Sequence, residues 1–541
     1  MPAEPRGAGG GASSPRIPAL RIGIDVGGTN TDAVLMAGES VQAVHKTATT
    51  PDVTGGIGCA IDGLQQQRRF DPAAIAAVMI GTTHFTNAVV EGRRLAETAA
   101  IRLCLPATRG LPPFTDWPEP LRAALGGHVF LCHGGREFDG RSISPLDAAE
   151  VEAAAREIVS RGIRTVAITS VFAPVDPDDE RRAAAIVSAA APGVAISCSH
   201  EIGRVGLLER ENATILNAAL RDVADHITSA LTEAVSRAGI RAPVYISQND
   251  GTLMSVEACR RYPVATFASG PTNSMRGAAL LSGESDCVVV DVGGTTTDVG
   301  ALVHGFPREA AVAIAVGGVR TNFRMPDLVS FGLGGGSRVH RRDGGPRIGP
   351  DSVGYELTSR ALVFGGETLT ATDLAVAGGR CVIGDPARVA GLDRELVRSG
   401  LELIQARVAE LVDRVRTGPD PVPVVLVGGG SVLLGSELAG AARVIRPAHF
   451  AVANAIGAAI AQVGGETDTV VSLADQSRER AVAAAKHDAV ERAVAAGARA
   501  STVAIVEVEE IPLAYLPSNA VRIRVKAVGT LELTAAVPCD A

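Results

Sequence analysis

The hydrophobic pattern of the chain is built from short apolar runs that stop abruptly at glycine-containing turns. RIGI precedes Asp25, CVVV precedes Asp291, and VPVVLV precedes Gly428. Apolar runs of this length that end in a turn are typical of buried β-strands. We therefore expect a buried strand in front of each of these three turns.

Between residues 144 and 281, helical and strand-like patterns alternate. Ser144-Pro145 is expected to open a helix, because a hydroxyl cap, a proline in the first turn and Asp147 near the positive end favour a helix start. The elements expected in this region are a helix over 144–160, a strand over 163–172, a helix over 176–193, a strand over 194–199, a long helix reaching about residue 238, a strand that runs into a polar turn over 243–255, and a strand, turn and helix over 265–281. This alternation predicts a parallel or mixed sheet with helical crossovers.

The two ends of the chain carry further elements. RIGIDVGGTNTDAVLM reads as a β-hairpin around a Gly-Gly bend. The other expected elements are a strand over 41–46, a helix over 57–69, a strand ending at Gly81 with a helix from Thr86, a helix of small residues over 447–461, a charged alanine-rich helix over about 465–500, and two or three strands over 503–534.

One eight-residue phrase occurs twice, as DVGGTNTD from Asp25 and as DVGGTTTD from Asp291, with seven of the eight letters identical. Glycine has no Cβ, so such a turn lets backbone N–H groups and Thr hydroxyls converge on an anion. The leading aspartate stands at the end of a strand, where it is placed to hold a cation, and Mg²⁺ carried by a phosphate ligand suits that position. Two such turns facing each other would form a phosphate clamp.

Composition narrows the class of protein. A chain of 541 residues is expected to form about three domains, and its net charge of −8 and 3% aromatic residues argue against a nucleic-acid partner. The most apolar stretch, 451–463, is too short to span a membrane. Residues 1–18 are rich in Pro, Gly and Ser and are expected to be a disordered tail rather than a signal peptide. The eight cysteines have no CxxC spacing and are expected to be reduced thiols of a cytoplasmic protein.

Several segments admit two interpretations each. Thr82 and Thr83 stand at a strand-to-helix transition, where open α/β sheets place ligand contacts, but a hydroxyl there also serves as a helix cap. Glu211 and Asn212 are candidates for the substrate side of a cleft, or for a solvated first turn of a helix. FGLGGGSRV (331–339) is either a third ligand turn or a flexible hairpin. No Walker loop, dinucleotide fingerprint, HExxH or GxSxG is present.

The order of the two octamers, the later VGGGS and the NAIGAA segment resembles the actin, sugar-kinase and Hsp70 ATPase superfamily. That resemblance implies an α/β fold of two ribonuclease-H-like lobes with mixed sheets, each lobe supplying one phosphate loop. It implies ATP as cofactor and Mg²⁺ held through water by Asp25 and Asp291. By the same resemblance the nucleotide would be bound by Gly27, Gly28, Thr29, Asn30, Thr31, Gly293, Gly294, Thr295, Thr296 and Thr297 at its phosphates and by Gly428, Gly429 and Gly430 at its adenosine.

Within that superfamily the sequence motifs are most similar to those of the hydantoinase A / 5-oxoprolinase family. RIGIDVGGTNTD, IGTTHFTNAVVEG, SHEIGRVGLLERENATILNAAL, the NDG before SGP, DVGGTTTDVG and LVGGGS all resemble blocks of that family and cover most of residues 20–465. The resemblance implies ATP-driven hydrolysis of a cyclic amide such as a hydantoin or 5-oxoproline, usually with a second, hydantoinase B-like subunit. Two departures stand out: Val329 replaces a family histidine, although Asp327 is kept, and the C-terminal part is shorter than in large members.

The hypothesis for the chemistry is phosphoryl activation of the amide carbonyl, because a resonance-stabilised cyclic amide otherwise resists attack. Asp25 and Asp291 are expected to act through the metal, with Thr82, Thr83, Glu211 and Asn212 on the substrate side. Asp32 and Asp298 are candidates for metal or water orientation, or simply cap their own hairpins. Two rival functions remain: a kinase-like subunit of an acetone-type carboxylase, and an ATPase reactivation or binding subunit without its own substrate.

The expected domain division follows the repeats. The first lobe is expected over residues 19–245 and the second over 246–465, with a small α+β segment over 466–541.

Overall fold

The computed structural model describes residues 19–50, 53–310, 313–342, 345–474, 476–514 and 519–533. The expected tail over residues 1–18 therefore lies outside the described residues. Within the described part of the chain, no helix is long and apolar enough to cross a membrane.

The first lobe is organised around a nine-stranded sheet with the strand order β22-β23-β21-β10-β9-β4-β1-β2-β3. Its strands are β1 (Leu20–Val26), β2 (Asn30–Ala37), β3 (Ser40–Ala48), β4 (Ile75–Thr82), β9 (Val244–Ser247), β10 (Thr252–Ser255), β21 (Gln462–Val471), β22 (Ala504–Pro512) and β23 (Val521–Gly529). The strand β1 pairs antiparallel with β2 and parallel with β4. The hairpin predicted from the first octamer is confirmed.

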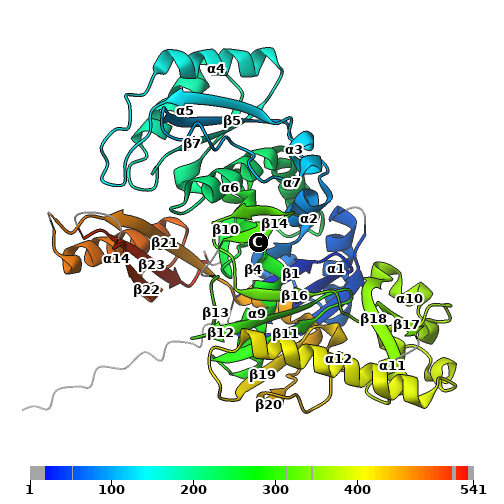
Figure 1. Cartoon of the computed structure of the whole chain (residues 1–541). Helices are drawn as coiled ribbons and strands as arrows, with labels where there is room; N and C mark the ends of the chain where they lie inside the picture. Colours follow the sequence, from blue (N-terminus) through cyan, green and yellow to red (C-terminus); the bar gives the residue numbers. More distant parts are fainter. Residues whose placement is uncertain are drawn as a thin grey trace, which may run out of the picture.

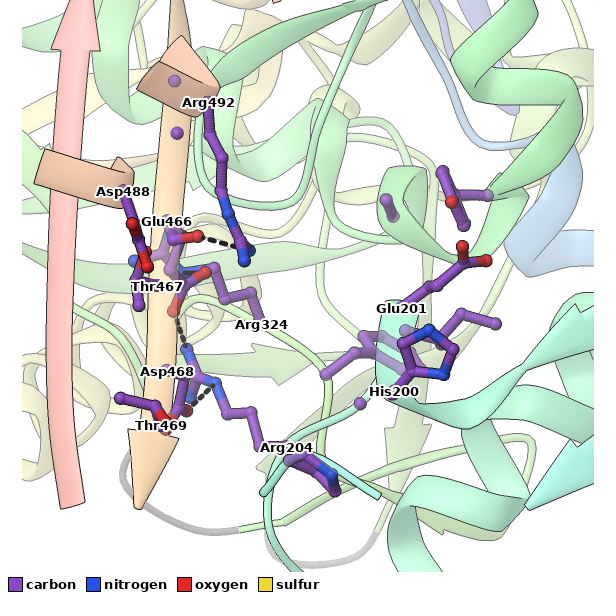
Figure 2. Close-up of a pocket in the computed structure, with 18 of the residues that line it drawn as sticks. His200, Glu201, Arg204, Arg324, Glu466, Thr467, Asp468, Thr469, Asp488 and Arg492 are labelled. Atoms are coloured by element: carbon purple, nitrogen blue, oxygen red, sulfur yellow. Dashed lines mark hydrogen bonds and ion pairs between the residues drawn. The ribbon is translucent and has the colours of Figure 1, made fainter. Parts of the chain in front are cut away.

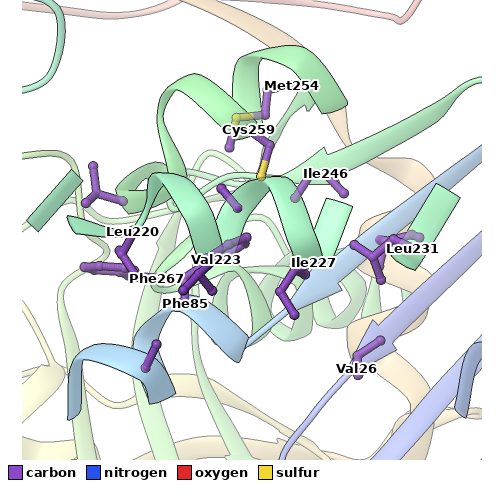
Figure 3. Close-up of a cluster of buried hydrophobic side chains, with 14 of the residues drawn as sticks. Val26, Phe85, Leu220, Val223, Ile227, Leu231, Ile246, Met254, Cys259 and Phe267 are labelled. Atoms are coloured by element: carbon purple, nitrogen blue, oxygen red, sulfur yellow. The ribbon is translucent and has the colours of Figure 1, made fainter. Parts of the chain in front are cut away.

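Helices cover both faces of this sheet, which explains why β1 is an almost uninterrupted apolar run. They include α1 (Val53–Gln67), α2 (His84–Glu91), α7 (Arg221–Arg237), α8 (Val256–Arg261), α9 (Ser269–Ser282) and α13 (Ala453–Ile460). Figure 3 shows part of the resulting core, where Phe85 of α2 and Ile227 of α7 lie among buried apolar side chains with Ile246 of β9.

The second lobe repeats the same plan. Its six-stranded sheet has the order β13-β12-β11-β19-β20, with β16 also paired to β12. These strands are β11 (Cys287–Val292), β12 (Thr297–Val303), β13 (Phe306–Pro307), β16 (Leu328–Phe331), β19 (Val422–Val427) and β20 (Ala441–Ile445). β11 pairs antiparallel with β12 and parallel with β19, as β1 does with β2 and β4. Two ribonuclease-H-like sheets are thus present, and the predicted fold class is confirmed.

A separate parallel sheet is inserted into the first lobe, and Figure 1 shows it at the top of the molecule. Its order is β6-β5-β7-β8, built from β5 (Thr98–Leu105), β6 (His128–His133), β7 (Thr165–Ser170) and β8 (Ala195–Cys198), with the helices α3 (Glu119–Ala124), α4 (Ala148–Ser160), α5 (Asp178–Ala190) and α6 (Leu207–Ala219). The predicted alternation is confirmed here. The helix start is corrected: Asp147 caps α4 through Ala149 and Glu150 N–H groups, whereas the Ser144 hydroxyl donates to Leu105 O.

Three other expected elements differ. The long helix to residue 238 is two helices, α6 and α7, that meet at Leu220. The strand expected at 265–268 is a short 3₁₀ turn (Pro263–Thr266) that leads into α9. The helix expected from residue 465 begins later, as α14 (Arg478–Ala495), because residues 462–471 form the strand β21.

The sheet of the first lobe also crosses the expected domain boundaries. β10 lies beyond residue 245, and β21, β22 and β23 come from the C-terminal segment, yet all four strands extend that sheet. Figure 1 shows β21 to β23 and α14 reaching out from the body of the molecule. Two further hairpins are present: β14 (Ile314–Val316) pairs with β15 (Val319–Thr321), and β17 (Ser337–Arg342) pairs with β18 (Gly345–Ser352). The helices α10 (Leu357–Arg360), α11 (Ala371–Ala377) and α12 (Arg394–Val415) follow them in the chain.

Two crossing helices, α9 and α13, join the lobes. An ideal Cβ on Gly277 would lie 1.9 Å from Ala453 O, and one on Gly457 would lie 1.8 Å from Asn273 O. Only glycine permits backbones to approach so closely. This contact holds α13, which follows the second lobe's glycine turn in sequence, against the first lobe's sheet.

Candidate functional site

Each copy of the repeated octamer brings two aspartates together. Asp25 and Asp32 are direct partners across β1 and β2, and Asp291 and Asp298 are partners across β11 and β12. The matching register follows from the matching turn length, because four residues, 27–30 and 293–296, lie between the last paired residues of each hairpin. Four carboxylates are thereby placed at the ends of the two hairpins.

The two turns have the same backbone hydrogen bond. Gly27 N donates to Asn30 O at 3.0 Å, and Gly293 N donates to Thr296 O at 2.8 Å. The two turns therefore share the same internal backbone bond. Their role in binding an anion stays a prediction.

The turns also face each other across the lobes. An ideal Cβ on Gly294 would lie 3.3 Å from Cγ2 of Thr29. The third glycine-rich segment braces the second turn, since Gly335 N donates to Gly293 O at 3.0 Å and Gly336 N donates to Gly294 O at 2.7 Å. Residues 332–336 are thus a packed loop between β16 and β17.

The first pair of acids is buried and held by two donors that the sequence did not single out for this role. Asn454 Nδ2 donates to Oδ2 of Asp25 and to Oδ2 of Asp32, at 2.9 Å each. Lys46 Nζ lies 2.5 Å from Oδ1 of Asp32. Oδ1 of Asp25 is buried and has no hydrogen-bond partner among the described residues.

These surroundings shift the titration of the acids. Burial, together with the charge of Asp32, raises the pKa of Asp25 to about 7, although the bond from Asn454 opposes the shift. Burial also raises the pKa of Asp291, against a hydrogen bond from Ser274. Burial raises the pKa of Asp298 to about 6. Carboxylates that repel one another in a desolvated cleft are the expected setting for a cation.

The triple-glycine turn packs directly on the second hairpin. Gly428 has φ 79°, and an ideal Cβ there would lie 2.2 Å from Oδ1 of Asp291. An ideal Cβ on Gly430 would lie 2.5 Å from Gly293 O, while Gly429 is exposed and open. Packing therefore requires glycine at positions 428 and 430, whereas position 429 is exposed and has space for a side chain.

The hydroxyls of the two turns divide into two groups. Thr31 Oγ1 lies 3.3 Å from Thr49 Oγ1, and Thr297 Oγ1 donates to Leu333 O at 2.7 Å. Both hydroxyls belong to buried residues and form hydrogen bonds within the protein. Thr29 and Thr295 are only partly buried. Asn30 is likewise partly buried, and Thr296 is exposed. A ligand between the turns would meet this second group of side chains.

The segment after β4 lies beside the first turn. Thr83 N donates to Val26 O at 3.4 Å, and the Thr83 hydroxyl makes no cap bond to α2. Thr82 Oγ1 lies 2.6 Å from His84 Nδ1. Burial lowers the pKa of His84 to about 4, so its imidazole is neutral near pH 7. The hydroxyl-cap interpretation of Thr83 is therefore wrong, and this strand end adjoins the acids: an ideal Cβ on Gly81 would lie 2.4 Å from Asp25 Oδ1.

Glu211 and Asn212 are buried side chains of α6 and do not lie in a solvated helix turn. Arg102 Nε donates to Glu211 Oε1 at 2.8 Å in a fully buried ion pair. Asn212 accepts a bond from Trp117 Nε1 at 2.7 Å and donates to Arg320 O at 2.9 Å. These contacts join α6 to the inserted sheet and to the β14–β15 hairpin, and they use most of the hydrogen-bonding capacity of both side chains.

The hairpin acids and turns fit Mg²⁺ and a polyphosphate by their chemistry. Carboxylate oxygens are the donors that Mg²⁺ prefers, and backbone N–H groups suit phosphate. Several of the buried polar atoms that make no hydrogen bond among the described residues belong to these turns or to residues beside them, including Asp25 Oδ1, the Asn273 amide and Ser431 Oγ. Buried polar atoms cost free energy until a ligand or water satisfies them, so their presence here supports a binding site.

A cavity of about 790 Å³ lies elsewhere, between the loop over 200–204, β10, β21 and α14. Figure 2 shows Arg204 and Arg324 directed at Glu466 and Asp468 of β21. None of the lining residues belongs to the two hairpin turns. The cavity and the acids of the two hairpins are therefore separate features of the molecule.

One side-chain cluster beside this cavity has metal-ligand residue types, namely Glu180, Cys198 and His200. The Glu180 carboxylate already accepts bonds from Ser170 N at 2.7 Å, from His200 N at 3.0 Å and from the Ser199 hydroxyl, and it lies 2.6 Å from His200 Nδ1. Its oxygens are occupied by protein donors, so the cluster serves to anchor the segment after β8.

Two hairpin-led sheets that face each other through acid-bearing glycine turns define a two-lobed, actin-like architecture. Comparison with known proteins gives the family. The sequence model of the hydantoinase/oxoprolinase N-terminal region matches residues 21–191, and that of hydantoinase/oxoprolinase matches residues 210–391. The chain therefore belongs to the hydantoinase/oxoprolinase family, as the motif order predicted.

Individual relatives are more distant. The chain is 26% identical to the caprolactamase subunit alpha of Pseudomonas jessenii over 492 residues, which is 81% of this chain and 65% of that protein. It is also 26% identical to the acetophenone carboxylase gamma subunit of Aromatoleum aromaticum, covering 66% of this chain and 53% of the relative. The chain thus spans less than two thirds of the length of these relatives.

Solved structures show the same fold. The ATP-dependent caprolactamase from Pseudomonas jessenii aligns with a TM-score of 0.75 at 20% identity, covering 95% of this chain and 88% of that one. A nucleotide-free acetone carboxylase aligns with a TM-score of 0.67 at 19% identity, covering 96% and 89%.

Proposed function

We propose that this protein uses ATP to open the ring of a cyclic amide, such as a hydantoin or a 5-oxoproline-like lactam. The observation that carries the proposal is the pair of facing turns, in which Gly294 approaches Thr29 closely and four carboxylates converge. Family membership and the likeness to a caprolactamase subunit support the cyclic amide as substrate class.

In this proposal the ATP phosphates bind between the two turns. Backbone N–H groups of 27–31 and 293–297, with the hydroxyls of Thr29 and Thr295, contact phosphate oxygens. Asp25 and Asp291 hold Mg²⁺, directly or through water, and Gly428–Gly430 pack on the adenosine. Mg²⁺ supplies charge neutralisation on the phosphates when bound. The protein's own residues orient the phosphates and exclude water from the cleft.

The proposed reaction has two stages. The amide oxygen attacks the γ-phosphorus, the bond from that phosphorus to the ADP oxygen breaks, and ADP leaves. Water then adds to the ring carbon that carries the phosphoryl oxygen; the ring nitrogen takes a proton and the C–N bond breaks, which leaves an acyl phosphate. A second water cleaves this acyl phosphate and releases inorganic phosphate, so that one ATP and two waters give the open-chain amino acid, ADP and phosphate. Positioning and charge stabilisation are the main demands on the protein in such a transfer. The neutral His84 beside Thr82 and Thr83 is available for hydrogen bonding at the substrate end of this cleft.

A partner is part of the proposal, because the caprolactamase and carboxylase relatives are subunits of larger enzymes. A hydantoinase B-like chain would complete the ring-opening step. A second candidate function is favoured by the carboxylase relatives, which match at similar identity: the chain would phosphorylate a carbonyl compound for a carboxylating partner.

The test measures ADP release by the purified chain with and without a panel of lactams and hydantoins, then with simple ketones and bicarbonate. Cyclic amides that stimulate ADP release and yield amino acids support ring opening. Stimulation by ketones alone supports the carboxylase-type role. ADP release that responds to neither, but only to a co-purified protein, would contradict both.

A further inference from the structure

The amide of Asn454 makes an unusual set of bonds at the first acid pair. Nδ2 donates one hydrogen to Asp25 Oδ2 and the other to Asp32 Oδ2, both at 2.9 Å. Oδ1 of Asn454 accepts from Ala455 N at 2.9 Å, which fixes the direction of the amide. One side chain thus bridges two carboxylates that repel each other.

Because of this bridge, one carboxylate oxygen of the pair has no hydrogen-bond donor or ion-pair partner among the described residues. Asp32 has its Oδ2 on Asn454 and its Oδ1 beside Lys46. Asp25 has its Oδ2 on Asn454, and its Oδ1 has no partner among the described residues. That free oxygen lies over Gly81, where an ideal Cβ would come within 2.4 Å of it. Among the four oxygens of the pair, Asp25 Oδ1 is therefore the one with neither a hydrogen bond nor an ion pair to a described residue.

The helix that carries Asn454, α13, packs closely against β1. An ideal Cβ on Gly23 of β1 would lie 2.1 Å from Ala455 O, so α13 rests directly on the strand that carries Asp25. α13 follows the triple-glycine turn, and Gly428 N donates to Phe450 O at 2.8 Å. The same short segment therefore contacts the second lobe's glycine turn and the first lobe's acids.

The basic residue beside the Asp25–Asp32 pair is a lysine, Lys46, and not an arginine. The chain contains 48 Arg and only three Lys, of which Lys46 is one. A compact ammonium fits beside two carboxylates without the bidentate grip of a guanidinium. Lys46 can therefore neutralise Asp32 while leaving Asp25 Oδ1 open.

We propose that Asn454 is a positioning residue for the cation site: it holds the Asp25 and Asp32 carboxylates in one orientation and directs Asp25 Oδ1 at the metal. The inference rests on the metal assignment made under the proposed function. It assigns to Asn454 no contact with the metal or the substrate. Groups that orient metal ligands typically alter metal affinity about 10- to 100-fold when they are removed.

The experiment titrates Mn²⁺ into the full chain with a non-hydrolysable ATP analogue and follows free Mn²⁺ by electron paramagnetic resonance. Asn454→Ala is expected to weaken Mn²⁺ binding about tenfold. Asn454→Ser keeps one donor and is expected to fall between wild type and Asn454→Ala. Adenosine, which has no phosphate, is expected to bind wild type and both variants with equal affinity.

The matched control is Asn217→Ala. Asn217 is a fully buried amide whose Nδ2 also makes two hydrogen bonds, to Ser197 Oγ and Arg261 O. It is expected to lower the melting temperature and leave Mn²⁺ affinity unchanged. If Asn454→Ala does not fold, Asn454→Ser carries the comparison.

An Mn²⁺ affinity that is the same in wild type, Asn454→Ala and Asn454→Ser would overturn the inference, whatever happens to stability. The proposed function fails separately: a wild-type chain that binds Mn²⁺ with the analogue but never turns over ATP would contradict the proposed reaction and leave the role of Asn454 intact. A wild-type chain without Mn²⁺ affinity would overturn both.

Discussion

Gly294 of the second turn lies against Thr29 of the first: an ideal Cβ on Gly294 would be 3.3 Å from Thr29 Cγ2, which is tighter than most Cβ contacts. The two copies of one octamer therefore meet tip to tip. A ligand that binds both turns would link the two lobes at this point, and a side chain at position 294 would separate them.

Gly294→Val is expected to impair nucleotide binding more than folding. The φ of Gly294 is not in the left-handed region, so valine adopts the backbone conformation, but its branches would push on Thr29. We expect at least a tenfold loss of affinity for an ATP analogue, measured by calorimetry. The control is Gly391→Val, outside both turns, because an ideal Cβ there meets no atom within 4 Å. Equal affinity of Gly294→Val and wild type would show that the turns do not act together.

Neighbouring glycines in the triple-glycine turn are expected to differ sharply in stability. Gly428→Ala would place a methyl group against Asp291 Oδ1 and force φ 79° on alanine, with an expected loss of about 2–3 kcal/mol. Gly429→Ala meets nothing within 4 Å and is expected to leave the free energy of unfolding within about 0.5 kcal/mol. Chemical denaturation of both variants checks this; a Gly428→Ala variant as stable as Gly429→Ala would contradict the packing.

Asp25→Asn is expected to stabilise the ligand-free protein at alkaline pH. Burial raises the pKa of Asp25 to about 7, so the native state must ionise a desolvated group above that pH. An ordinary aspartate pKa of about 4 sets an upper limit of about 4 kcal/mol on the gain. The variant should also lose most of its Mg-ATP turnover. Thermal melts at pH 8 and an ADP-release assay measure the two effects, and a less stable variant with normal turnover would exclude a metal role.

The same pKa predicts how stability depends on pH. A carboxyl group with a raised native pKa binds its proton more tightly in the folded state. Its stabilising contribution is complete below about pH 4 and is lost as pH rises to about 7; Asp298, with a pKa of about 6, loses its contribution over a similar range. Mg²⁺ with nucleotide should offset this loss, so melting curves with and without them should diverge more at pH 8 than at pH 5. Equal divergence would contradict the assignment.

Glu211→Gln tests whether that residue supports the fold. It would leave Arg102 buried with no carboxylate partner, and breaking such a pair costs about 3 kcal/mol or more. Glu209→Gln, two residues earlier, breaks a pair with the exposed Arg320 and should cost about 0–1 kcal/mol. Urea unfolding measures both. A stable Glu211→Gln variant that has lost turnover would instead place Glu211 in the chemistry.

Local patterns were enough to predict the nucleotide-type turns. Asp25 and Asp291 end buried strands because apolar residues cover both faces, and the Gly-Gly bend returns each chain in register, so residues within eight positions determine each hairpin. The alternation over 144–238 predicted a parallel or mixed sheet with helical crossovers for the same reason, but not that this sheet is a separate insertion that also contains β5 and β6. The strand β21 was not predicted, because its glycines, threonines and other small residues were assigned to the alanine-rich helix that follows. Its pairing partners, β10 and β23, are also distant in sequence.

What the sequence alone determined, then, is the repeated strand–turn unit and the family that its order defines. The tertiary structure decided the use of each polar group. Glu211 became a buried ion-pair partner because the inserted sheet brings Arg102 to it across 109 residues. Asn454 became the bridge between two aspartates 429 and 422 residues away because α13 packs on β1 through glycines. Hydrophobic periodicity and turn chemistry act over a few residues, whereas the partner of a buried polar side chain depends on how whole elements pack.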